Sequence, residues 1–213
     1  MSWTNRHWGE IWSLAQVHLY LSLLPVLFGL VLAIPLGWLA SQSRVLRGFL
    51  LSVSGILYTV PSLALVVVMP ILLGTSILDP VNMVVTLTIY TVALLIRSVA
   101  DALAAVPREV IASANAMGFR PLRRFLTVEL PLSVPVLVAG LRVATVSNIS
   151  LASVGALIGL GGLGQLFTDG EQRAIIPEVV AGVVACVVLA VVADSILILL
   201  GRLVTPWNRA VRR

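Results

Sequence analysis

Long stretches without a charged residue are the feature that most limits how this chain can fold. They run over residues 11–43, 48–78, 80–96 and 143–168. A bilayer core about 30 Å thick is crossed by a helix of about 20 apolar residues, and several of these stretches reach that length. Charged residues make up only 11% of the 213-residue chain, against roughly a quarter in soluble domains. The sequence therefore predicts an all-helical integral membrane protein.

The uncharged stretches predict five transmembrane helices, with a cytoplasmic helix between the third and the fourth. The predicted spans cover residues 18–41, 50–73, 80–99, 134–157 and 179–201. Residues 1–17 are then an extracytoplasmic or interfacial segment, 18–204 form one transmembrane domain, and 205–213 form a basic cytoplasmic tail. Tryptophans near the N-terminus are spaced to lay a short helix in the outer interface. A membrane-dipping helix there would raise the number of spans to six.

The distribution of arginine predicts the orientation. Arginine supplies all 14 basic residues, and most of them lie in segments 42–49 and 100–133 and in the tail. With five spans these segments share one side of the membrane, which the positive-inside rule makes the cytoplasm. Only Arg6 and Arg173 fall on the other side. The N-terminus is therefore predicted outside and the C-terminus in the cytoplasm.

Several kinds of chemistry are excluded by the composition. A chain without lysine has no P-loop lysine, Schiff-base lysine or Ser-Lys dyad, so any ATP is bound by another subunit. The single Cys186 lies in an apolar run and has no partner for an internal disulfide. Neither His7 nor His18 belongs to a carboxylate or thiol cluster, so no metal site or catalytic triad is predicted.

Two charges fall within or near the predicted fourth and fifth spans. Arg142 and Asp194 would be costly inside the bilayer as isolated charges. Snorkelling to the interface or pairing with each other would reduce that cost. The sequence favours a structural pair over an ion- or proton-coupling site.

The insert between spans three and four has the pattern of two short helices joined by a bend. Pro107 suits a helix start, and Gly118 suits the left-handed residue that ends the first helix. Phe119-Arg120-Pro121 predicts a turn, because the residue before proline avoids helical geometry. A second helix is predicted over residues 121–129, broken at Leu130-Pro131.

Small residues in the first of these helices would let another protein approach closely. They are Ala112, Ser113, Ala114 and Ala116. An amphipathic hairpin lying on anionic lipid is the other interpretation, and the residues by themselves do not choose between the two.

This insert resembles the cytoplasmic EAA loop of ABC-importer permeases, whose pattern is E-A-A-x-x-x-G followed about a dozen residues later by L-P. The matching positions are Ala112, Ser113, Ala114, Gly118, Leu130 and Pro131, with Phe119 and Arg120 beside the glycine. Ala112 replaces the glutamate and Ser113 the first alanine, while the spacing is kept. In that family the loop is a coupling helix that docks on the ATPase, and the resemblance implies this role for the eight residues.

Two further stretches, "VELPLSVPVLVAGLRVA" and "YTVPSLALVVVMP", resemble permeases of glycine betaine, carnitine and choline importers. The resemblance implies a type I importer fold, multi-pass in a prokaryotic inner or plasma membrane. It also implies a second permease chain, identical or related, ATPase subunits that carry the ATP and Mg²⁺, and an extracytoplasmic binding protein. This chain itself is expected to be no enzyme and to carry no cofactor.

A glycine-rich run follows span four. Gly159, Gly161 and Gly164 satisfy G-x-G-x-x-G, but a dinucleotide site needs a strand and a βαβ unit, which the sequence does not predict. A similar G-G-L-G run occurs in related importer permeases, including methionine-type ones. The glycines are interpreted as allowing close helix packing and irregular backbone beside a cavity.

The expected function is the permease subunit of an ATP-driven importer for a quaternary-amine osmoprotectant. Predicted path-lining residues are Tyr58, Pro61, Ser62, Asn148 and Ser150. Recognition of the cation by aromatic side chains is assigned to the binding protein, because aromatic residues are few in the spans. Import of methionine or another amino acid is the main alternative, and a non-transporting scaffold or receptor is the second.

Overall fold

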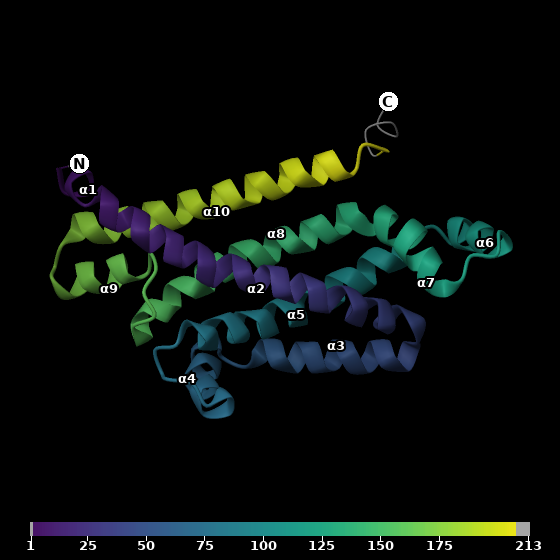
Figure 1. Ribbon diagram of the computed structural model, residues 1–213, viewed down its shortest axis with the longest axis horizontal. Helices are drawn as coiled ribbons and strands as arrows, with labels where there is room; N and C mark the ends of the chain where they lie inside the picture. The colour runs from purple at the N-terminus through teal and green to yellow at the C-terminus, as the bar shows by residue number, and fades with distance from the viewer. Residues whose placement is uncertain (1, 208–213) are drawn as a thin grey trace.

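The computed structural model describes residues 2–207, which form helices joined by short turns (Figure 1). The long helices are α2 (Trp8–Gln42), α5 (Pro80–Ala104), α8 (Leu130–Val154) and α10 (Ile176–Val204). The shorter helices are α1 (Ser2–Arg6), α3 (Arg44–Thr59), α4 (Ser62–Leu73), α6 (Arg108–Ala116), α7 (Pro121–Arg124) and α9 (Gln165–Gln172). A π-helical turn (Phe125–Glu129) leads into α8, and a 3-10 turn (Gly155–Ile158) follows it. Residues 208–213 of the predicted basic tail lie outside the described residues.

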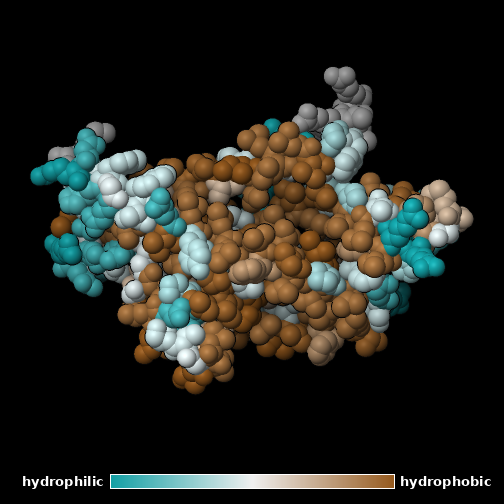
Figure 2. All heavy atoms as spheres, viewed as in Figure 1, coloured by the Kyte–Doolittle hydropathy of each residue, from teal (hydrophilic) through white to brown (hydrophobic). Residues whose placement is uncertain are grey.

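A wide hydrophobic band crosses the middle of the molecule, and hydrophilic residues gather at its two ends (Figure 2). Helices α1 and α9 lie at one end, and α6 and α7 lie at the other (Figure 1). An apolar band between two polar ends is the surface that a bilayer requires. The structure thus places the N-terminal helix and the α6–α7 insert on opposite sides of this band.

Four helical stretches are long and apolar enough to cross a membrane: α2, α5, Pro121–Ile158 and α10. Each of them contains one predicted span, so four of the five spans are confirmed as continuous helices. Helix α2 is longer than its predicted span, and the boundary predicted after residue 17 falls inside it.

The predicted span 50–73 is not one straight helix. Helices α3 and α4 meet at an angle of 99°, so together they form a broken span or a re-entrant segment. Val60 and Pro61 between them are both extended, with ψ angles of 131° and 127°. The physical reason is Pro61, which has no N–H to donate and which keeps the preceding residue out of helical geometry.

Helix α5 is the centre of the bundle and packs against α2, α3, α4 and α8. Its closest neighbour is α2, which turns a buried stripe of small residues, Gly29, Ala33 and Gly37, towards it. A β-carbon at Gly29 would lie 2.5 Å from Thr91 Cβ, and one at Gly37 would lie 2.5 Å from Val99 Cβ. Small residues four apart let membrane helices approach closely, and here they set the separation of α2 and α5.

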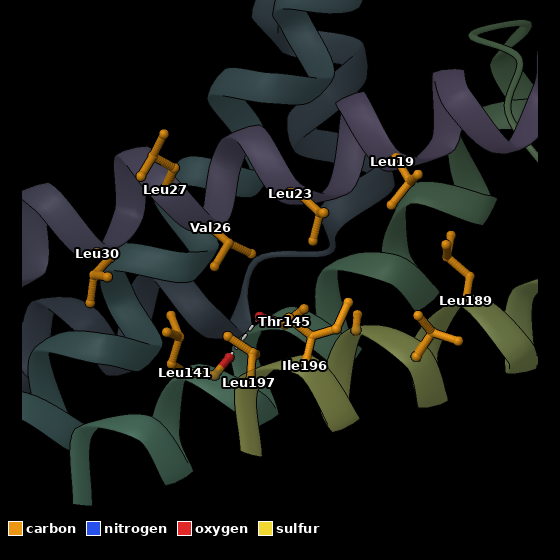
Figure 3. Close-up of a pocket in the computed structure, with 12 residues that line it drawn as sticks. Leu19, Leu23, Val26, Leu27, Leu30, Leu141, Thr145, Leu189, Ile196 and Leu197 are labelled. Carbon is orange, nitrogen blue, oxygen red and sulfur yellow. Dashed lines mark hydrogen bonds between the residues drawn. The ribbon is translucent and has the colours of Figure 1, made fainter. Parts of the chain in front are cut away.

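Helix α10 is held to the bundle less tightly than the other long helices. It packs on α8 and α9 but has few contacts with α2. An apolar hollow of about 410 Å³ lies between α2, α8 and α10, with leucine side chains of α2 and α10 on its two walls (Figure 3). Arg142 of α8 and Asp194 of α10 form a two-bond ion pair, with Nε–Oδ1 and Nη2–Oδ2 distances of 2.6 and 2.8 Å. The predicted pairing of these two charges is therefore confirmed.

Exchanging the two charges tests how much this pair contributes. Arg142→Leu or Asp194→Leu should lower the amount of folded protein in the membrane several-fold, because each leaves one charge without its partner among apolar helices. The exchange Arg142→Asp with Asp194→Arg should restore much of the loss. Fluorescence-detected size-exclusion of detergent extracts measures the folded amount. If the exchange variant gave as little folded protein as the single variants, the ion pair would not be what holds α10 to the bundle.

Candidate functional site

The α6–α7 insert has the helix–bend–helix form predicted from the sequence. Helix α6 begins after Pro107 and ends in a Schellman motif, in which the Phe119 N–H donates to the Ala114 carbonyl (3.1 Å) and the Gly118 N–H to Asn115 (3.0 Å). Gly118 has a φ of +78°, which confirms the predicted left-handed residue. A residue with a β-carbon is disfavoured there, and this explains the glycine.

The second helix of the insert is not broken at Leu130-Pro131, contrary to the prediction. Helix α7 runs through the π-helical turn into α8, and the Leu130 N–H donates to the Phe125 carbonyl five residues earlier. Pro131 has no N–H for the helical ladder, so the irregularity falls in the turn before it and the chain stays helical. The insert is therefore joined to α8 without a flexible break.

The predicted coupling residues do not all face outwards. Ala112, Ser113, Gly118 and Arg120 are exposed, while Phe119, Leu130 and Pro131 are half-buried. Ala114 is buried inside the hairpin, so a direct contact of Ala114 with a partner does not fit the structure. Its small side chain lets the hairpin close instead.

Two exposed apolar residues at the tip of the insert were missed by the sequence analysis. Met117, at the end of α6, is 68% exposed, and Leu122, at the start of α7, is 56% exposed. They flank the bend on both sides of Gly118. The sequence could have indicated them, because each is an apolar residue beside a predicted turn in a polar segment. Large apolar side chains exposed at such a place often belong to a binding surface.

The predicted path residues separate into two groups. Tyr58, Pro61 and Ser62 lie together at the break between α3 and α4, and Ser150 is exposed on α8. Asn148 is buried, and its amide donates to Thr91 Oγ1 at 2.8 Å. The prediction that Asn148 lines a path is thus not supported. Its side chain is a polar link between α8 and α5.

Tyr90 of α5 stabilises the break and was not predicted. Its hydroxyl donates to the carbonyl of Val60, which the break leaves without a helical partner. Its ring lies 5.7 Å from the ring of Tyr58, which is 48% exposed. Ser62 and Leu151 of α8 both line a hollow of about 10 Å³, which is too small for a solute.

The glycine-rich run forms an irregular turn that is held by His18. Gly159, Gly161 and Gly162 all have φ angles between +76° and +83°. His18 of α2 is fully buried, with Nε2 at 2.9 Å from the Ile149 carbonyl and Nδ1 accepting the Leu163 N–H at 3.3 Å. The run follows a 3-10 turn and not a strand, in agreement with the rejection of a dinucleotide site.

The described residues thus form a multi-spanning helical protein with a helical hairpin at one polar end, where the sequence predicts a coupling loop. The chain belongs to the family of binding-protein-dependent transport system inner membrane components, whose family model matches residues 21–210. It is therefore the permease subunit of an ABC importer and a multi-pass inner-membrane protein, and ATP is hydrolysed on a separate subunit. Permeases of this family typically carry no cofactor.

Two relatives and one solved structure show what this chain is similar to. The glycine betaine/carnitine/choline transport system permease protein OpuCD of Bacillus subtilis is 30% identical over 193 residues, 90% of this chain and 83% of OpuCD. The ergothioneine transport permease/ergothioneine binding protein EgtU of Helicobacter pylori is 36% identical over 166 residues, 78% of this chain and 30% of EgtU. A chain of the inward-facing methionine ABC transporter MetNI has a TM-score of 0.79 at 23% identity, covering 92% of this chain and 96% of that one. The MetNI similarity shows the fold alone.

Proposed function

We propose that this chain is the permease of an importer for quaternary-amine osmoprotectants such as glycine betaine, choline, carnitine or proline betaine. The observation that carries the proposal is the similarity to OpuCD, which extends over 90% of this chain. The two sequence stretches that resemble such permeases map to the α3–α4 break and to the start of α8. Methionine or another amino acid is the alternative, and MetNI supports it only through its fold.

The proposed transporter contains two permease chains, identical or related, two ATPase subunits with their ATP and Mg²⁺, and an extracytoplasmic binding protein. EgtU, whose name joins a permease and a binding protein, supports a close association of these two functions. The exposed surface around Gly118, with Ala112, Met117 and Leu122, is proposed to dock on the ATPase. Closure of the ATPase pair on ATP would draw the two hairpins together and switch the path from inward- to outward-facing.

The proposed path runs beside the α3–α4 break. Tyr58, Pro61 and Ser62 are grouped there, and the exposed Ser150 is proposed to belong to the same surface. Irregular backbone at membrane depth is tolerated where it lines a cavity or is buried in protein, which favours the break as part of the path.

Uptake measurements test the proposed solute. Deletion of the gene should lower the uptake of labelled glycine betaine, choline or carnitine at high osmolarity, and expression from a plasmid should restore it. Ergothioneine and methionine belong in the same panel, because EgtU and MetNI carry those solutes in their names. A defect confined to methionine would replace the proposed solute by the alternative.

Cysteine labelling tests the proposed orientation. In a Cys186→Ala background, Glu171→Cys on α9 should react with an impermeant maleimide in intact cells, and Ser43→Cys should react only after permeabilisation. Both positions are exposed in the structure, so access to the reagent depends on the side of the membrane. Labelling of Ser43→Cys from outside would reverse the orientation.

A further inference from the structure

Arg124 joins the two ends of the α6–α7 insert. Its guanidinium donates through Nη1 to the Asn115 side-chain oxygen at 2.6 Å and through Nε to the Glu129 carboxylate. Asn115 lies in the last turn of α6, and Glu129 is the last residue before α8. One side chain therefore connects the exposed helix of the insert to the base of a transmembrane helix.

The half of this connection that joins Arg124 to Glu129 is largely buried, and the half that joins Arg124 to Asn115 is exposed. The side chains of Arg124 and Glu129 are only 17% and 7% exposed. A planar guanidinium that bonds two acceptors fixes the angle between them, whereas an ammonium group would act as a point charge. The Arg124 fork thus holds Asn115 and Glu129 in one relative orientation.

The chain leaves helical geometry on both sides of α6. Pro107, before α6, has a ψ of 135°, Gly118 has a φ of +78°, and Arg120 has a ψ of 151°. Because of these non-helical residues, α6 is not a continuous extension of either neighbouring helix, and no unbroken helix carries a change in its angle to α8. Arg124 closes the insert across these residues.

The far end of the connection is anchored in the bundle. Phe125 follows Arg124, is buried, and stacks on Trp38 of α2 with a ring separation of 5.1 Å. Glu129 leads directly into α8, and α8 is tied to α5 by the Asn148–Thr91 bond. A displacement of α6 would therefore reach a helix that is packed against the centre of the protein.

We propose that Arg124 is a positioning residue that transmits the movement of α6 to α8 during transport. The proposal rests on the proposed docking of the insert on the ATPase. In this proposal Arg124 does not act by contact with solute or nucleotide. It acts through Asn115 and Glu129, and without it α6 would follow the ATPase while α8 stayed behind.

The test uses the complete transporter, permease with ATPase and binding protein, reconstituted in proteoliposomes with labelled glycine betaine. Asn115→Leu and Arg124→Gln should each lower the solute moved per ATP hydrolysed by about 5-fold or more, within the usual range of coupling between sites. The number of ATPase subunits per permease should stay unchanged. Asn115→Asp keeps an acceptor for Arg124 and should retain wild-type coupling.

Two comparisons separate transmission from a general effect. The double variant Asn115→Leu with Arg124→Gln should move as much solute per ATP as Arg124→Gln alone, because both changes break the same connection. Arg47→Gln is the matched control, since it also removes an arginine that is paired with a carboxylate, Asp101 at 2.7 Å, but between α3 and α5. It should leave the solute moved per ATP unchanged.

Wild-type coupling in Asn115→Leu would overturn the proposal, and so would an equal loss in Asn115→Asp or Arg47→Gln. Loss of the ATPase from Asn115→Leu would also overturn it, because the residue would then act in docking. Asn115 is exposed, so its variants keep the test valid if Arg124→Gln does not insert. Failure of the docking proposal is recognised separately, by normal ATPase binding and uptake in a variant with a bulky residue at Gly118.

Discussion

Gly118→Trp should leave the permease in the membrane but reduce the binding of its ATPase and the uptake of solute about tenfold or more. Among the described residues, nothing apart from its two chain neighbours lies within 4 Å of a β-carbon built at Gly118, so a side chain there starts into open space in the isolated subunit. The left-handed backbone adds strain of roughly 1–2 kcal/mol. In a docked complex the indole would collide with the ATPase, and a collision of about 1.4 kcal/mol already lowers affinity tenfold. Copurification of ATPase with permease, together with uptake, measures the result.

Three variants identify the cause of such a loss. Gly118→Asn should be tolerated, because asparagine adopts left-handed geometry more readily than other residues and adds little bulk. Ala112→Trp, on the exposed face of α6, should release the ATPase as Gly118→Trp does. Gly48→Trp makes the same change at an open position of α3 and should have no effect. A hairpin that lies on lipid would be anchored more strongly by tryptophan, so full ATPase retention with normal uptake would contradict docking.

The spans and the insert were predictable because they depend on local patterns. A helix that crosses lipid bonds its own backbone, so charge-free runs such as 80–96 report it directly. The bend at Gly118 was predictable for a similar reason, since a single residue carries the conformational requirement. Nothing distant in the chain has to be known for either prediction.

The break between α3 and α4 could not be predicted from local sequence patterns. Hydropathy is continuous through 50–73, and it does not distinguish a straight helix from two helices at 99°. Pro61 was predicted to line the path but not to end a helix. A proline by itself does not decide this, because Pro25 and Pro35 lie inside α2 and that helix stays continuous. The difference lies in tertiary support, because Tyr90 bonds the carbonyl that the break exposes.

Pairings between distant residues could not be predicted from one sequence. His18 bonds the carbonyl of Ile149, 131 positions away, and Asn148 bonds Thr91. Asn148 was assigned to the path because polar residues in spans are often functional, and here its partner satisfies it inside the bundle. Arg142 and Asp194 were the exception, because two opposite charges in apolar runs have few other ways to reduce the cost of lying in the membrane.

The close contact of α2 and α5 leads to the second large prediction. Gly37→Val should abolish the stable fold, with a cost of about 3 kcal/mol or more. A β-carbon at Gly37 would lie 2.5 Å from Val99 Cβ and 3.3 Å from the Ile96 carbonyl. Val99 is fully buried in α5, the most buried of the spans, so neither helix has room to shift. The folded fraction after detergent extraction, followed on heating by fluorescence-detected size-exclusion, measures the effect.

The decisive comparison is a compensating change across the contact. In a double-mutant cycle, Gly37→Ala should cost less stability in a Val99→Gly background than in the wild type, because glycine removes the β-carbon that the new methyl group would meet. Gly55→Val makes the same substitution as Gly37→Val on the exposed face of α3, where nothing lies within 4 Å, and should be tolerated. If Gly37→Val were as stable as Gly55→Val, α2 and α5 would not be held at the separation that the small residues define. Because α5 also carries Thr91 and Tyr90, a shift of α2 against α5 would reach both the Asn148 link and the α3–α4 break.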